Sequence, residues 1–139
     1  MIDQVLLNGS DYIDDFLFAG KAVFTIRNPV TNKSFTFKIK ASRSGMVHFV
    51  SVLTGCNNES DYTYIGYISN GQFKYGKGKS PIGNDAPSVR AFSWFMRNRG
   101  NLGSVECYRS NNCARCGRKL TVASSVLAFL GPECAKRIA

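Results

Sequence analysis

The cysteines near the C-terminus have the spacing of a metal site. Cys113 and Cys116 are separated by two residues and followed by Gly117, and Cys134 follows a Gly-Pro-Glu segment further on. A two-residue gap lets a tight turn direct both sulfurs to one point, and glycine supplies the backbone freedom that such a turn needs. The spacing therefore predicts a structural zinc site in which Cys113, Cys116 and Cys134 are three of the ligands.

Tetrahedral zinc requires a fourth ligand. We expect it to be Cys107, which lies six residues before Cys113 on an expected strand at residues 104–108. The alternatives are His48, the single histidine of the chain, and Cys56. Both are distant in sequence, so they can reach the site only if the first part of the chain folds back onto it.

Two other uses of these cysteines are less consistent with the sequence. A redox Cys-x-x-Cys pair normally lies in a strand-helix-strand context, whereas Cys113 and Cys116 lie between a polar loop and a basic segment. A disulfide framework needs an oxidising compartment, and the N-terminus shows no secretory signal. Five cysteines would also leave one unpaired. We therefore expect a cytoplasmic zinc protein.

The positive charge of the chain is concentrated in its second half. The net charge is +9; residues 1–71 contain six Lys/Arg and six Asp/Glu, and residues 72–139 contain twelve and three. Such asymmetry indicates an anionic partner, for which nucleic acid is the commonest case. A basic surface that serves only solubility is the alternative explanation.

The segment at residues 74–79 alternates lysine with glycine next to Tyr75, which is typical of a flexible arm that binds phosphates. It is not a nucleotide-hydrolysing loop, because Phe73 replaces the first required glycine and Pro81 opposes an immediate helix. Tyrosines of a neighbouring strand are a possible stacking platform for bases. The residues predicted to contact nucleic acid are Lys74, Lys77, Lys79, Arg97, Arg99, Arg115, Arg118 and Lys119.

The elements that position these residues form an α+β fold. Ser10 and Asp11 favour a short helix that ends near residue 18, and strands are expected at residues 21–27, 35–40, 46–53, 62–68 and 72–75. In the second of these strands apolar and basic residues alternate, so one face should be buried and the other wet and basic. Apolar residues then recur at helical spacing over residues 85–99.

We therefore predict a twisted antiparallel sheet covered by one helix, in a domain at residues 1–103. A C-terminal zinc knuckle, similar to a treble clef, should form a second domain at residues 104–139. No apolar stretch reaches membrane-spanning length, so no membrane partner is expected. Enzymatic activity is not expected either, because the chain has one histidine and an all-cysteine zinc site has no open coordination position.

Several segments of the chain, at residues 18–25, 48–55, 61–66, 113–121 and 131–134, resemble small uncharacterised proteins of phages and bacterial mobile elements. The C-terminal part resembles a zinc-binding domain of unknown function that also occurs attached to larger proteins, some of them concerned with DNA. The resemblance implies a histidine four residues before the first knuckle cysteine, where this chain has Arg109. Cys107 lies two residues earlier on the same side of the strand, so its thiolate is positioned to replace that imidazole.

Two functions are consistent with these features. The first is a non-enzymatic, zinc-stabilised protein that binds single-stranded DNA or RNA. The second is an adaptor or inhibitor, encoded by a phage and acting in the host cytoplasm, that binds an acidic host protein such as a defence or nucleic-acid-handling enzyme. Steep salt dependence toward generic oligonucleotides would favour the first.

Overall fold

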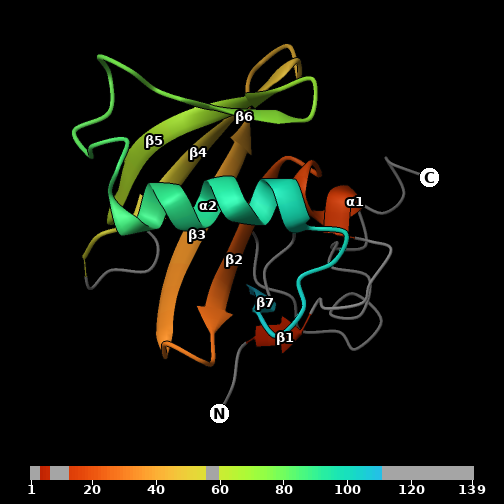
Figure 1. The fold of residues 1–139 in the computed structure, drawn as a ribbon. Helices are drawn as coiled ribbons and strands as arrows, with labels where there is room; N and C mark the ends of the chain where they lie inside the picture. Colours follow the sequence, from red (N-terminus) through yellow and green to blue (C-terminus); the bar gives the residue numbers. More distant parts are fainter. Residues whose placement is uncertain (1–3, 7–12, 56–59, 111–139) are drawn as a thin grey trace.

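The structure is a computed structural model that describes residues 4–6, 13–55 and 60–110 (Figure 1). Two helices are described, α1 (Ile13–Leu17) and α2 (Pro87–Asn98). The strands of the described residues are β1 (Gln4–Leu6), β2 (Lys21–Asn28), β3 (Lys33–Ala41), β4 (Val47–Leu53), β5 (Tyr62–Ser69), β6 (Gln72–Tyr75) and β7 (Glu106–Ser110).

The described strands form one antiparallel sheet of seven strands in the order β1-β7-β2-β3-β4-β5-β6. Helix α2 lies across one face of this sheet (Figure 1). The predicted α+β class, the antiparallel sheet and its covering helix are therefore confirmed. The predicted zinc knuckle lies outside the described residues. No helix within the described ranges is long and apolar enough to cross a membrane.

Strands β2 and β3 form the expected hairpin, and their side chains alternate between a buried and an accessible face. Phe24 of β2 and both Phe37 and Ile39 of β3 are fully buried, whereas Lys38 and Lys40 between and after them remain accessible. The alternation follows from the period of two along a strand. The predicted division of β3 into an apolar and a basic face is confirmed.

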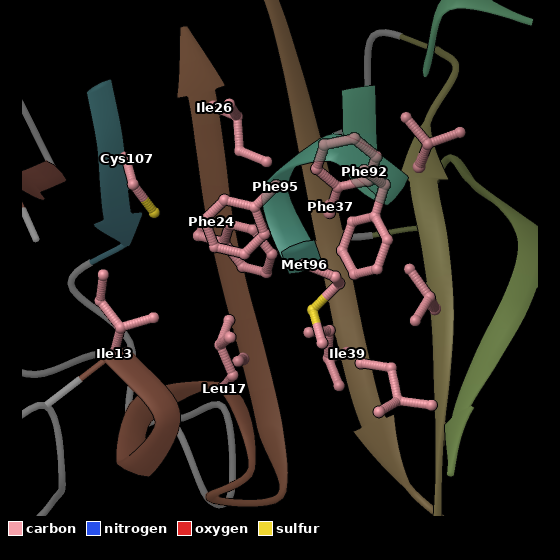
Figure 2. Close-up of a cluster of buried hydrophobic side chains, with 14 of the residues drawn as sticks. Ile13, Leu17, Phe24, Ile26, Phe37, Ile39, Phe92, Phe95, Met96 and Cys107 are labelled. Atoms are coloured by element: carbon pink, nitrogen blue, oxygen red, sulfur yellow. The ribbon is translucent and has the colours of Figure 1, made fainter. Parts of the chain in front are cut away.

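The apolar face of α2 supplies the other half of the core. Pro87 occupies the first turn, where its missing N–H costs no hydrogen bond, and Ala86 precedes it without a side-chain cap. The helix therefore begins two residues later than the 85–99 pattern predicted. Phe92 and Phe95 are fully buried against the strands, as Figure 2 shows.

Strand β7 joins the sheet between β1 and β2, with Cys107 opposite Ile26. Cys107 is fully buried and directed toward the core cluster (Figure 2). The predicted domain boundary after residue 103 thus falls just before a strand that pairs with the first half of the chain. Strand β1 was not expected from the sequence, since three residues carry little periodic signal.

Candidate nucleic-acid interface

The face of the sheet opposite α2, here called the outer face, presents aromatic and basic side chains. Lys38 and Lys40 lie on it because they alternate with buried Phe37 and Ile39. No described helix or strand packs on this face. Phe49 retains 44% of its accessible surface there, an unusual exposure for a large apolar ring that indicates a binding surface.

One row of side chains crosses five strands of the outer face. The register pairs Lys21 with Lys40, Lys40 with Phe49, Phe49 with Tyr67 and Tyr67 with Lys74. Neighbouring strands are about 4.8 Å apart, so the row spans roughly 19 Å. Its two aromatic rings are therefore flanked on both sides by lysines, an arrangement that suits bases with phosphates to either side.

A β-bulge in β5 brings Tyr64 to the same face as Tyr67. Val50 pairs with Gly66 but the next residue, Ser51, pairs with Tyr64, so Ile65 is the extra residue. In a regular strand, side chains three positions apart point to opposite faces, and the bulge removes this mismatch. Tyr64 then lies beside Phe49, with ring centroids 6.3 Å apart and an interplanar angle of 63°.

The charge of the outer face comes from its lysines. The Nζ of Lys38 lies 4.3 Å from the centroid of the Tyr62 ring, within the range of a cation–π interaction. Burial raises the pKa of Tyr62 and of Tyr64, and the nearby Tyr67 adds to the rise for Tyr64, so both phenols are neutral at physiological pH. Glu106 lies on the same face, where its carboxylate accepts a 2.8 Å hydrogen bond from Arg27.

The predicted basic arm closes one end of this surface. A hollow of about 660 Å³ is lined by Phe49, Tyr64 and Tyr67 together with Lys77 and Lys79. Both lysines are exposed, and no described residue lining the hollow is acidic. The stacking platform and the arm, which the sequence analysis treated as separate features, therefore share one site.

Backbone hydrogen bonds hold the arm in place. The N–H of Gly76 donates to the carbonyl of Ile65 at 2.9 Å, and the carbonyl of Gly76 accepts from the N–H groups of Lys79 and Ser80 at 3.0 and 2.9 Å. Gly78 has φ +82°, a conformation that favours glycine. The segment is thus a tight turn anchored to β5, which presents its lysines at a defined position.

The two arginines predicted on the helix are not part of this surface. Arg97 lies on α2, on the other side of the sheet. Arg99 follows α2 and is engaged within the protein: its Nε donates to Asp14 at 2.6 Å, and its Nη1 donates to the carbonyl of Met96 at 2.6 Å. Predicted contacts at Arg115, Arg118 and Lys119 lie outside the described residues.

Of the predicted zinc ligands, only Cys107 falls within the described residues; Cys113, Cys116, Cys134 and the alternative Cys56 do not. Burial raises the pKa of the Cys107 thiol to about 12. His48 lies on β4, three strands from Cys107, which is roughly 14 Å across the sheet. The two side chains therefore cannot bind the same ion. Within the described ranges, no group of three potential metal ligands occurs.

Residues 106–139 match a family of unknown function, DUF6011. The match begins at β7, so it includes the last described strand and the region of the predicted zinc site, but less than half of the chain. No curated protein and no solved structure matches the chain significantly.

Proposed function

We propose that the protein binds single-stranded DNA or RNA, without enzymatic turnover, on the outer face of its sheet. The observation that carries this proposal is the cross-strand row in which Phe49 and Tyr67 are flanked by Lys40 and Lys74. Bases stack on exposed aromatic side chains whatever their sequence, while lysines neutralise the phosphates.

The shape of the surface favours a single strand over a duplex. The aromatic rings lie on a sheet and contribute to binding only if unpaired bases can be splayed onto them. In a duplex the bases are already stacked on one another, so a duplex would gain only the phosphate contacts of the lysines. We therefore expect weaker, more salt-dependent binding of duplex DNA.

The proposal includes a structural zinc ion on Cys107, Cys113, Cys116 and Cys134, which would fix the C-terminal segment next to β7. Three of these thiols are supported by their spacing, and Cys107 by its place on the strand that leads into the segment. We propose no catalytic role for the metal. An origin in a phage or mobile element rests on the resemblance described above.

The experiment is fluorescence anisotropy of the zinc-loaded protein with labelled oligothymidylate, oligouridylate and duplex DNA at several salt concentrations. Single strands should bind more tightly than the duplex. Replacing Tyr64 and Tyr67 with alanine should cost about 1–3 kcal/mol per stacked base, whereas phenylalanine at both positions should preserve binding. If no oligonucleotide binds even at low salt, the proposal is wrong and the basic surface would instead fit an acidic protein partner.

A further inference from the structure

A second cavity lies on the opposite side of the sheet from the outer face. This cavity, here called the helix groove, has a volume of about 990 Å³ and runs between α2, the turn end of the β2–β3 hairpin and residues 102–105. Figure 1 shows the turn end of the hairpin extending past α2, which leaves this part of the sheet uncovered by the helix. The volume is within the range of pockets that hold small molecules and cofactors.

The wall that α2 contributes carries a stripe of two arginines and a tryptophan. Arg90, Trp94 and Arg97 are spaced by four and three residues, so they lie on one side of the helix. Val89, Phe92 and Phe95 face the core instead. At a rise of 1.5 Å per residue, the two arginines are about 10.5 Å apart along the axis, with Trp94 between them.

The opposite wall is apolar with a cation at its rim. Phe35 and Leu102 line it, and the exposed Lys33 lies at the end of the hairpin. None of the described lining residues is acidic. Within the described part of the chain, no carboxylate pairs with Arg90, Arg97 or Lys33, in contrast to Arg27 and Arg99, which both form ion pairs.

We propose that the helix groove binds a nucleoside phosphate, with the base stacked on Trp94 and phosphate groups held by Arg90 and Arg97. Arginine binds phosphate with two parallel hydrogen bonds, and tryptophan offers the largest ring for stacking. Cations on both sides of the ring fit a ligand that carries phosphate next to a base. The ligand has two sources, a free nucleotide and the phosphorylated end of a strand. This site is separate from the outer face and does not depend on it.

The single tryptophan of the chain makes the groove observable on its own. Titration of the full-length protein with AMP should quench the fluorescence of Trp94 in a saturable manner. Adenosine and inorganic phosphate should each act at least about tenfold more weakly, because each lacks one half of the recognised chemistry. Free N-acetyltryptophanamide serves as the reference for absorption by the nucleotide.

Variants locate the site. Arg90→Gln and Arg97→Gln should each weaken AMP binding about tenfold or more, while Arg43→Gln, at an exposed turn between β3 and β4, should leave it unchanged. The Tyr64→Ala/Tyr67→Ala variant should respond to AMP like the wild type, which separates failure of this site from failure of the outer face. In that background, tighter binding of a 5′-phosphorylated oligonucleotide than of its 5′-hydroxyl form would identify a strand end as the ligand; equal binding with retained AMP affinity would identify the free nucleotide.

Three results would overturn the proposal. One is the absence of quenching by AMP, and another is equal AMP binding by the wild type and the two glutamine variants. The third is quenching by oligoglutamate but not by AMP, which would make the groove a site for acidic peptides.

Discussion

Gly76 and Tyr64 are in such close contact that a side chain at position 76 has no room. A Cβ built on Gly76 would lie 2.5 Å from Cε2 of Tyr64 and 3.1 Å from its hydroxyl oxygen. The contact joins the basic arm to the stacking platform, because the arm turns directly over the edge of the tyrosine ring.

Gly76→Ala should therefore displace the ring of Tyr64 and weaken binding of single-stranded oligonucleotides several-fold. The ring can rotate away, so the melting temperature should change little. Anisotropy and thermal unfolding measure the two effects. Gly100→Ala is the matched control, because Gly100 has open space at its Cβ position and no positive φ. Equal affinities for the two variants would show that the Tyr64 ring does not bind nucleic acid.

Replacing Lys77 and Lys79 with alanine should reduce affinity for all oligonucleotides and reduce the salt dependence of binding by about 0.7 per lost phosphate contact on a single strand. Both side chains are exposed at the hollow and form no described ion pair, so their loss should not affect folding. Anisotropy over a salt series gives the slope. An unchanged slope would remove the arm from the binding surface.

Phe92→Ala should destabilise the fold by about 3–5 kcal/mol, because it creates a cavity where four aromatic rings meet the helix. The centroid of Phe92 lies 4.8 Å from that of Phe73, 5.0 Å from that of Phe37 and 6.1 Å from that of Phe95. Urea unfolding measures the loss, and Val30→Ala, at a residue 81% exposed, should change stability by less than about 0.5 kcal/mol. Similar losses in both variants would contradict the described core.

His48 should make the protein less stable in mild acid. Burial lowers its pKa below the ordinary value of 6.5, and a hydrogen bond with the backbone of Phe18 opposes this only in part. The unfolded chain therefore binds more protons near and below pH 6.5, so stability falls as the pH decreases through that value. Compared with His48→Gln, the wild type should lose stability in urea unfolding as the pH drops from about 7 to 5. A difference between the two that does not vary with pH would show that His48 titrates alike in both states.

Zinc content should depend on Cys107 as well as on Cys116. The rise of the Cys107 pKa from 9.0 to about 12 disfavours the thiolate by about 4 kcal/mol, whereas structural zinc contributes about 10–16 kcal/mol in small modules. Metal binding therefore outweighs the cost of ionising this buried thiol. Cys107→Ser and Cys116→Ser should each lower zinc content by metal analysis, and Cys56→Ser should not. Full zinc content in Cys107→Ser would leave Cys107 a core residue only.

The sequence predicted the features that depend on local periodicity. Alternation around Phe37 and Ile39 predicted the basic face of β3, and helical spacing around Phe92 predicted the face of α2 that covers the sheet. It could not predict relationships between distant residues. The insertion of β7 beside β2 and the ion pair of Arg99 with Asp14 depend on long-range pairing that leaves no local pattern.

The candidate interface shows the same limit. The tyrosines of β5 and the lysines of the arm were recognisable by type and spacing. Phe49 was not, because its exposure depends on which strands flank β4. A regular strand would have directed Tyr64 and Tyr67 to opposite faces, and the bulge at Ile65 that brings them together is visible only in the register with β4.

The most direct test of the outer face as a nucleic-acid site is NMR of the protein with labelled aromatic side chains, titrated with oligothymidylate. We predict that the ring signals of Phe49, Tyr64 and Tyr67 shift progressively and saturate together, while those of buried Phe24 and Phe95 remain in place. Saturable binding that leaves the three outer rings unshifted would contradict the account and place the nucleic acid elsewhere on the protein.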